Sequence, residues 1–444
     1  MASEMVKKAK HDDMISNLPD SILSLILSSL PIKNAVSTSI LSTRWRYLSA
    51  ALFNLDVDFR LFRRSPHIKS FTTFMDKMLF FRSEGRIEQF RLYHICISEI
   101  DDSRVFGWIF AALWLGVKEI NMVFAGKYIN IPTLLTALLF TSKSLVRLKL
   151  DMPFLMTVPI HVRLPSLKTL ELRSVKFEDD DSIKRVFAGC PLLEDLSIFD
   201  CDLRNITCLK ISNPSLTSLT LVFIDNLKVN SFSSLAFSID IDLPSLVYFK
   251  YQGFTKINYS ALHMPSLVRA DVKIHGRICL TREIDGLVEL FQRIDNVKSL
   301  HLSINAEALP YLSHKSFAAF QNLLKLDIMD WRNAYRGRGI LQFFEFSPNL
   351  QTLVIYKVSS NEAWLPMEKV PSCLVHQLKE FKVLDFDDQS CLFILVTYIL
   401  KNAAVLEKLT ICTSKVLMPR EELKIIKQLL SLPRCSNKCQ VTAF

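Results

Sequence analysis

Glycine and charge are both scarce in this chain. Only 10 of its 444 residues are glycine, which leaves little room for the Gly-rich loops that cradle phosphates. The sequence contains no G-x-x-x-x-G-K loop, no G-x-S-x-G elbow and no H-E-x-x-H helix, so these classes of enzyme site have no support. Charged residues make up 22% and hydrophobic residues 50% of the chain, which argues against wholesale disorder. The composition indicates a folded protein without a familiar catalytic motif.

Long apolar runs and paired cysteines are missing as well. The run from Val105 to Val117 is too short to span a bilayer, so we interpret it as a buried helix. The first 13 residues are polar and lack the apolar core of a secretory signal. None of the 10 cysteines forms a CxxC pair, and Cys435 and Cys439 lack a second pair of ligands at zinc spacing. We expect reduced thiols, no metal or cofactor, no membrane contact, and an intracellular location in the cytoplasm and/or nucleus.

One short apolar motif recurs through most of the chain. It consists of an apolar residue, two variable residues, an apolar residue, one variable residue and a last apolar residue. Its copies begin at Ile87, Val117, Leu145, Leu167, Leu193, Leu216, Leu246, Leu267, Val297, Leu323, Leu350, Leu378 and Leu406. The 319 positions from the first to the last copy hold twelve intervals, which gives a mean period of about 27, within the range of leucine-rich repeats.

The motif predicts one strand in each repeat. Its last two apolar positions alternate with a variable residue, as in a half-buried strand. Helical patterns lie between several copies, at 182–187, 286–294, 340–346 and 390–402. The sequence therefore predicts an α/β fold, an irregular leucine-rich-repeat solenoid with one curved parallel sheet and helices on its convex side. Between 202 and 273 strand-like segments occur with almost no helical pattern, so we expect extended connectors there and leave the repeat boundaries open.

Residues 13–50 do not follow the repeat. Pro19 suits the first turn of a helix, and Pro31 ends it. The apolar residues of this helix, which cover an arc of about 200°, are Ile22, Leu23, Leu25, Ile26, Leu27 and Leu30. Its remaining interior positions are uncharged serines. Docking on the first repeat would hide only one side of such a helix, so we favour a second partner for the other side.

The same segment resembles the plant-type F-box. The resemblance rests on Leu18-Pro19-Asp20-Ser21-Ile22-Leu23, Leu30-Pro31-Ile32-Lys33, Thr38-Ser39-Ile40-Leu41-Ser42 and Arg44-Trp45-Arg46. It implies a three-helix module that binds a Skp-type adaptor and, through it, a cullin–RING ubiquitin ligase. The adaptor-binding residues that it implies are Leu18, Pro19, Ile22, Ile26, Leu30, Leu41 and Trp45. Thr43 and Ser49 depart from the family pattern without altering the apolar face.

A second resemblance lies near the C-terminus. Trp364-Leu365-Pro366, Val370-Pro371-Ser372-Cys373-Leu374 and the segment from Tyr398 to Leu409 are similar to the FBD domain, which accompanies F-boxes and leucine-rich repeats in one plant family. Asp387-Asp388-Gln389 stands where that family often has a glycine followed by acidic residues. The two resemblances and the repeats imply an F-box at 13–50, a leucine-rich-repeat solenoid at 51–358, an FBD domain at 359–413 that continues the repeats, and a C-terminal helix and tail at 414–444.

The variable positions of the strands would form the exposed concave face. They carry both signs of charge and several aromatic residues, which is typical of protein recognition and not of a phosphodiester-binding stripe. The residues predicted to bind a substrate are Arg147, Lys149, Arg173, Phe199, Tyr248, Lys250, Arg269 and Tyr356. The net charge of +10 does not concentrate on this face. We interpret the basic segment 331–339 as a solvated connector, so we predict no nucleic-acid partner.

These observations favour a non-catalytic adaptor subunit. The nine histidines are scattered, and Cys373, although near His376, occupies a motif position that predicts packing. We therefore hypothesise a substrate-recognition subunit of a Skp–cullin–F-box ubiquitin ligase, whose repeats bind a protein substrate. The alternatives are an interaction scaffold that does not act through a ligase and a small-molecule co-receptor. The substrate, the pathway and any bridging small molecule stay open.

Overall fold

The computed structural model describes most of the chain. The described residues are 14–50, 52–61, 68–80, 87–96, 100–125, 131–224, 238–253, 258–275, 281–304, 319–329, 331–332, 343–356, 358–359, 369–386, 390–414 and 419–444. Two compact units divide the chain, Met1–Leu155 and Met156–Phe444. Among the described residues, no helix has both the length and the apolar character needed to cross a membrane.

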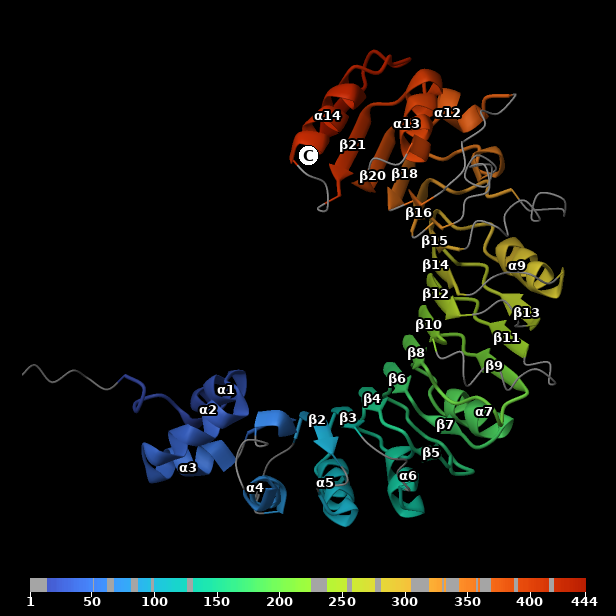
Figure 1. Cartoon of the computed structure of the whole chain (residues 1–444). Helices are drawn as coiled ribbons and strands as arrows, with labels where there is room; N and C mark the ends of the chain where they lie inside the picture. The colour runs from blue at the N-terminus through green and yellow to red at the C-terminus, as the bar shows by residue number, and fades with distance from the viewer. Residues whose placement is uncertain are drawn as a thin grey trace, which may run out of the picture. The chain divides into compact units, whose positions relative to one another are not determined.

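Three short helices open the first unit (Figure 1). They are α1 (Asp20–Ser29), α2 (Ile32–Ser37) and α3 (Thr43–Ala50), and the 3₁₀ turn η1 (Thr38–Ile40) joins the last two. Pro19 and Pro31 directly precede α1 and α2, because a proline has no N–H to leave unpaired at a helix start. The helix predicted between these two prolines is therefore present.

Four parallel strands follow in the first unit. They pair in the order β1 (Asn54–Asp58), β2 (Gln89–Cys96), β3 (Glu119–Ala125) and β4 (Arg147–Asp151). The connections contain η2 (Phe59–Leu61), α4 (Ile68–Phe80), α5 (Asp102–Trp114) and α6 (Thr133–Leu139). The strand β1 was not predicted from the sequence, although Leu52, Leu55 and Val57 have the motif spacing and are buried.

The helix α5 contains most of the run that we interpreted as a buried helix. Val105 and Trp108 are indeed buried, and the Trp108 indole N–H donates to the Asp76 carboxylate of α4 at 2.8 Å. Phe110 and Trp114 are exposed, and their rings stack with centroids 6.4 Å apart. The helix is therefore buried on one side only. The sequence did not indicate which side is exposed, because apolar residues occupy both.

The second unit also consists mainly of parallel strands. Its strands pair in the order β6 (Thr169–Arg173), β8 (Asp195–Phe199), β10 (Ser218–Val222), β12 (Tyr248–Gly253), β14 (Arg269–Ile274), β15 (Ser299–Ser303), β16 (Lys325–Ile328), β18 (Thr352–Tyr356), β20 (Glu380–Phe386), β21 (Lys408–Thr413) and β22 (Gln440–Ala443). Its longer helices are α7 (Asp180–Ala188), α9 (Thr281–Arg293), α13 (Ser390–Asn402) and α14 (Pro419–Leu430). Each repeat motif predicted from the sequence coincides with one strand of the two units.

A second, smaller sheet lies in the region where the sequence predicted extended connectors. It has three parallel strands in the order β9 (Cys208–Ser212), β11 (Ser238–Asp242) and β13 (Asn258–His263). Figure 1 shows α7, these strands and α9 on the same side of the main strands. Leu209, Ile239 and Ile241 are fully buried, so the strands cover the core there as helices do elsewhere. The region is thus regular, and alternating runs such as Ser-Ile-Asp-Ile-Asp carried the signal for it.

The register of the main strands is set by backbone hydrogen bonds. The carbonyl of Lys168 accepts the N–H groups of Glu194 and Asp195 at 2.9 and 3.0 Å, and the carbonyl of Glu194 accepts those of Thr217 and Ser218 in the same way. Leu170 therefore pairs with Leu196 and Leu196 with Leu219, all of them fully buried. The apolar positions of successive repeats stack in columns, and the side chains between them face away from this core.

Some motifs of the C-terminal resemblance lie outside the described residues. These are the segments 364–366 and 387–389, together with residues 333–339 of the basic segment. The remaining motif residues are described: Pro371 precedes α12 (Ser372–His376), and Cys373 and Leu374 are buried. The Cys373 thiol donates to the carbonyl of Phe344 at 3.3 Å. Cys373 is therefore a packed residue, as its motif position predicted.

Glycine is required where α7 ends. A Cβ atom added to Gly189 would lie 2.7 Å from the carbonyl oxygen of Val162, whereas one added to Gly107 in α5 would have its nearest neighbour, Phe80 Cζ, at 3.8 Å. We expect Gly189→Ala to lower the free energy of unfolding by about 1–3 kcal/mol, because backbone cannot move aside as a flexible side chain can. Gly107→Ala should be neutral or raise that free energy by about 1 kcal/mol. Urea unfolding followed by circular dichroism would measure both, and equal midpoints for the two variants would contradict the close approach.

Candidate functional site

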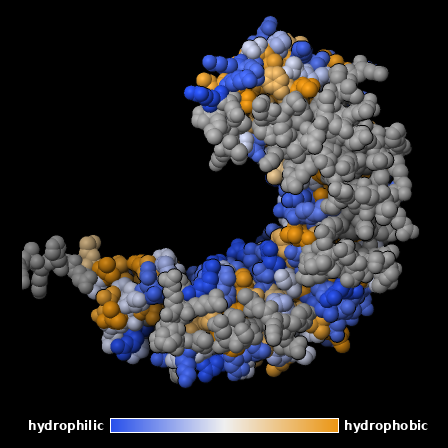
Figure 2. Space-filling model, in the orientation of Figure 1, coloured by the Kyte–Doolittle hydropathy of each residue, from blue (hydrophilic) through white to orange (hydrophobic). Residues whose placement is uncertain are grey.

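An exposed apolar surface lies on α1 and on the 3₁₀ turn η1. Figure 2 shows hydrophobic residues gathered there on the visible side. We define this N-terminal apolar patch as Ile22, Leu25, Ile26, Leu30, Ile40 and Leu41. Leu25, Leu41 and Ile40 are 66%, 65% and 85% exposed. The patch is uncharged, because serines occupy the polar positions of α1 and Asp20 stands at its start.

The other side of α1 is buried within its own unit. Leu23 and Leu27 have no exposed surface, and Ile32 and Ala35 of α2 and Leu48 of α3 are buried as well. The three helices thus bury one side of α1 and leave the other apolar side in solvent. This is the arrangement expected from the wide apolar arc, which one docking surface cannot cover.

The residues predicted to contact an adaptor fall into two groups. Pro19, Ile22, Ile26, Leu30 and Leu41 are exposed, whereas Leu18 and Trp45 are half-buried. The sequence analysis did not select Leu25 or Ile40, which are more exposed than Ile22 and Ile26. Both residues could have been predicted from the sequence. Leu25 belongs to the apolar arc of the first helix, and Ile40 belongs to the F-box motif Thr38-Ser39-Ile40-Leu41-Ser42.

Arg44 fixes the turn that leads into α1. Its guanidinium donates to the carbonyl of Ser16 at 2.6 Å and to the carbonyl of Leu18 at 2.5 Å, and its Nε donates to Asp20 Oδ1 at 2.8 Å. A planar guanidinium can serve several acceptors at once, which an ammonium group cannot do in fixed geometry. Arg44 therefore holds Leu18 and Pro19 in place beside the start of the helix.

The strand face is the second candidate surface, and its predicted residues lie in both units. Arg147 and Lys149 lie on β4 in the first unit, and the remaining predicted residues, Arg173, Phe199, Tyr248, Lys250, Arg269 and Tyr356, lie on strands of the second. None of them is buried. In every case the side chain alternates with buried apolar neighbours, so each unit presents its own set on the solvent side of the strands.

In the first unit the strand face carries a ladder of ion pairs. The Glu119 carboxylate, whose side chain is 8% exposed, lies 2.7 Å from Arg91 and 3.3 Å from Arg147. Arg91 also lies 3.4 Å from Asp56. The charges therefore compensate one another from β1 to β4, and Arg147 is already engaged.

In the second unit arginines stack on aromatic rings of neighbouring strands. The guanidinium carbon of Arg173 lies 4.2 Å from the ring centroid of Phe199, and that of Arg269 lies 5.4 Å from the ring centroid of Tyr248. The Tyr248 hydroxyl donates to Asp271 Oδ2 at 2.7 Å. Burial, together with this hydrogen bond, raises the pKa of Tyr248, so the hydroxyl stays a donor at neutral pH.

Asp327 is a largely enclosed carboxylate of the strand face in the second unit, with 13% of its side chain exposed. Lys325 Nζ lies 3.1 Å and His301 Nδ1 3.7 Å from Asp327 Oδ2. Burial acts to raise the pKa of Asp327, but hydrogen bonds and positive charge from His301 and Lys325 outweigh it and lower that pKa. Asp327 is therefore ionised and paired at neutral pH.

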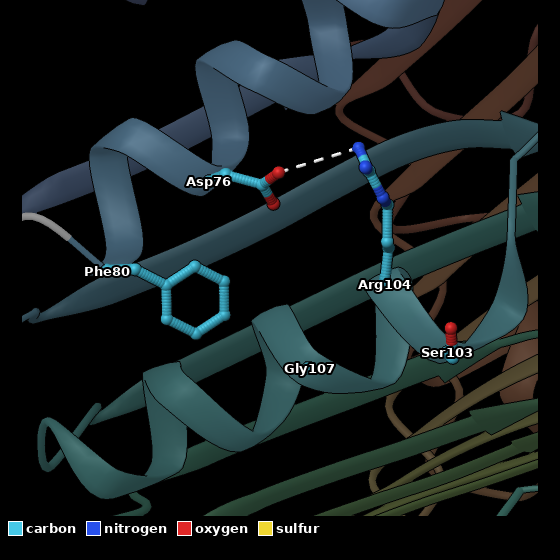
Figure 3. A pocket seen from close by; sticks show the side chains of 5 residues that line it. All are labelled: Asp76, Phe80, Ser103, Arg104 and Gly107. Atoms are coloured by element: carbon cyan, nitrogen blue, oxygen red, sulfur yellow. Dashed lines mark ion pairs between the residues drawn. The ribbon is translucent and has the colours of Figure 1, made fainter.

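The described residues offer little for a small ligand or a metal. A hollow of about 510 Å³ lies between α4 and α5, lined by Asp76, Phe80, Ser103, Arg104 and Gly107 (Figure 3). The Arg104 guanidinium lies 3.5 Å from the Asp76 carboxylate, so these two charges compensate each other and neither is left to attract a ligand. Within the described part of the chain, no group of three or more His, Cys, Asp or Glu side chains could hold a metal ion.

The Arg44 contacts generate a stability prediction. Arg44→Ala removes the donors to Ser16, Leu18 and Asp20, and we expect it to lower the free energy of unfolding by about 1–2 kcal/mol. Arg44→Lys should recover only part of this loss, since one ammonium cannot serve all three acceptors. Amide hydrogen exchange at Leu18 and Ile22 should become faster in Arg44→Ala and stay unchanged in Lys33→Ala, a control on the exposed surface of α2. Unchanged exchange in Arg44→Ala would show that the turn does not depend on this side chain.

Comparison with known proteins matches both parts of the chain. A family model for the F-box domain matches residues 15–52, and one described as "At1g61320/AtMIF1, LRR domain" matches residues 82–439. The Arabidopsis thaliana F-box/LRR-repeat protein At2g42730 is 30% identical and covers 97% of both chains. The FBD-associated F-box protein At4g10400 of the same plant is 31% identical over 97% of this chain and 99% of its own length. F-box/LRR-repeat protein At4g14096, also of that plant, is 32% identical over 89% of this chain and 87% of its own. The three N-terminal helices, the strand repeats and these matches together show that the chain belongs to the plant family of F-box/leucine-rich-repeat and FBD-associated F-box proteins.

Proposed function

We propose that this chain is the substrate-recognition subunit of a Skp–cullin–F-box ubiquitin ligase. The observation that carries the proposal is the uncharged N-terminal apolar patch on a helix whose other side is already buried. Removing such side chains from water is worth roughly 1.5–3 kcal/mol for each large residue fully buried, so a partner that covers the patch gains stable binding. A Skp-type adaptor is the partner that the F-box implies.

The repeats supply the second half of the proposal. Their strand faces combine arginine, tyrosine and phenylalanine with charges of both signs, which is the composition of protein-recognition surfaces. The chain would hold a protein substrate near the ubiquitin-loaded enzyme and supply proximity, while bond formation takes place on other subunits. We assign the F-box to 13–50, the solenoid to 51–358, the FBD domain to 359–413 and the C-terminal helix and tail to 414–444, and we expect action in the cytoplasm and/or nucleus.

Adaptor binding tests the first half directly. We expect Ile22→Ala combined with Ile26→Ala to weaken binding of a recombinant Skp-type adaptor by about 30-fold, because two anchoring side chains of an apolar interface are truncated. Leu18→Ala with Pro19→Ala should weaken it as well. Isothermal titration calorimetry on the full chain measures the change, with circular dichroism to show that each variant folds.

A matched control lies in the same unit. Leu134 in α6 is 68% exposed, so Leu134→Ala removes an equally apolar side chain outside the patch and should leave adaptor affinity unchanged. If the wild-type chain does not bind the adaptor, the ligase proposal fails and an interaction scaffold remains. If only added metabolites allow substrate binding by an adaptor-bound chain, the repeats act as a co-receptor.

Thiol reactivity tests the non-catalytic part of the proposal. Burial raises the pKa of Cys190 and of Cys373 to about 12, so both are protonated and poor nucleophiles at neutral pH. Cys435 is exposed. We expect iodoacetamide at pH 7.5 to label Cys435 in the folded chain and to leave Cys190 and Cys373 unlabelled by peptide mass mapping. Rapid labelling of Cys373 would instead indicate an activated thiol and reopen a catalytic role.

A further inference from the structure

The carboxylates of the strand face in the second unit all have partners. Glu171 lies 3.8 Å from Arg173, Asp195 accepts from Ser197, Asp271 accepts from Tyr248, Asp327 pairs with Lys325, and Glu380 lies 3.0 Å from Lys382. A partner that approaches this face therefore meets no unpaired negative charge among the described strand residues.

Two neighbouring lysines on the same face have no such partner. Among the described residues, no hydrogen bond or ion pair involves the side chain of Lys250 on β12 or of Lys273 on β14. The strands pair with Lys250 opposite Asp271 and Lys273 opposite Gln252, so the two lysines stand on adjacent strands, two positions apart. Both alternate with buried residues, Tyr251 and Val272 among them, and hence point to the same side of the sheet. We call them the lysine pair.

The residues around the lysine pair provide further donors. Arg269, which stacks on Tyr248, is exposed and lies on the same strand as Lys273. Its contact with Asp271 is long, at 3.4 Å, so most of its donor groups remain available. Asp271 already accepts the shorter hydrogen bond from Tyr248. The local surface thus offers three cationic groups beside one carboxylate that already accepts a hydrogen bond.

This arrangement suits a discrete acidic peptide more than a nucleic acid. A continuous phosphate backbone favours a stripe of one sign, and along this face it would have to pass the carboxylates of Asp271 on β14 and Asp327 on β16. A peptide can place an acidic side chain opposite each lysine and an uncharged one opposite each carboxylate, which is how charge complementarity gives specificity. A carboxylate and a phosphate group would be recognised by the same donors.

We propose that the strand face around Lys250, Lys273 and Arg269 binds an acidic segment of the substrate protein, through its carboxylate or phosphate groups. This inference rests on the proposed function, since it names the kind of substrate that the repeats would select. The three cations would bind the acidic side chains, and Tyr248 would pack beside the peptide.

Fluorescence anisotropy on the full chain tests the proposal with defined probes. The probes are labelled peptides of about twelve residues with spaced glutamates, with spaced phosphoserines or with spaced lysines, and a single-stranded RNA of equal length. We expect the wild-type chain to bind the glutamate or the phosphoserine peptide and not the lysine peptide. Lys250→Glu combined with Lys273→Glu should weaken that binding about tenfold or more, and added salt should weaken it in the wild type.

A control with the same change in charge lies in the same unit. Lys424 and Lys427 are exposed on α14, and Lys424→Glu with Lys427→Glu should leave peptide binding unchanged. Equal losses in the two double variants, or no binding of either acidic peptide at low salt, would overturn the proposal. Tighter binding of RNA than of both peptides, lost in the lysine-pair variant, would overturn it in favour of a nucleic acid.

Adaptor binding by the same variants separates the two proposals. If the lysine-pair variant and the wild type bind the Skp-type adaptor equally while neither binds acidic peptides, the inference about the substrate fails and the proposed function stands. If the wild type binds acidic peptides but no adaptor, the lysine pair is a binding site and the ligase function fails.

Discussion

The fold depends on one backbone contact that recurs at the start of the main strands. In most repeats a single carbonyl, such as that of Thr217, accepts two successive N–H groups from the next repeat, those of Val247 and Tyr248. The contact occurs in both units, and its hydrogen bonds are 2.7 to 3.4 Å long. Because it joins the same position of successive repeats, no residue can be inserted into the strand motif without breaking the register. Variation in repeat length therefore lies after the motif, in the connections and in the register shifts at Tyr93/Ile95 of β2 and Val383/Phe386 of β20.

This constraint explains how very different connections share one sheet. Some connections contain helices of 13 residues, such as α9 and α13, and others contain the short strands β9, β11 and β13. Each of these elements has one requirement, which is to cover the stacked apolar side chains on the buried side of the strands. The same register aligns the exposed positions of neighbouring strands, so that Arg269 reaches Tyr248 and His301 reaches Asp327. The interaction surface follows from strand pairing, whatever the connection.

The sequence predicted the repeated strands but not the strands at the two ends of the array. The strand motif identified the main strands from β2 to β21, because its buried positions keep one spacing. The motif also fits β1, which was not predicted because its single copy stands directly after the helical segment. The motif does not fit β22, whose Val441 has only weak apolar neighbours. The exposed patch was predictable from the width of the apolar arc on α1. Which lysines of the strand face lack partners was not, because that depends on contacts between residues more than 20 positions apart, such as Tyr248 and Asp271.

The two candidate surfaces differ in the physics that each offers a partner. The N-terminal apolar patch has no charge, so its binding gains from removing surface from water and changes little with salt or with small shifts in geometry. On the proposed function, the strand face would bind through arginine, lysine and tyrosine, whose hydrogen bonds and ion pairs need matched geometry and weaken as ionic strength rises. The first kind of surface suits a partner that stays bound, and the second suits a partner that must be distinguished from many others and then released. A chain that joins one constant partner to a selected one, as we propose, would need both kinds, and the uncharged apolar patch and the charged strands of the repeats are surfaces of these two kinds.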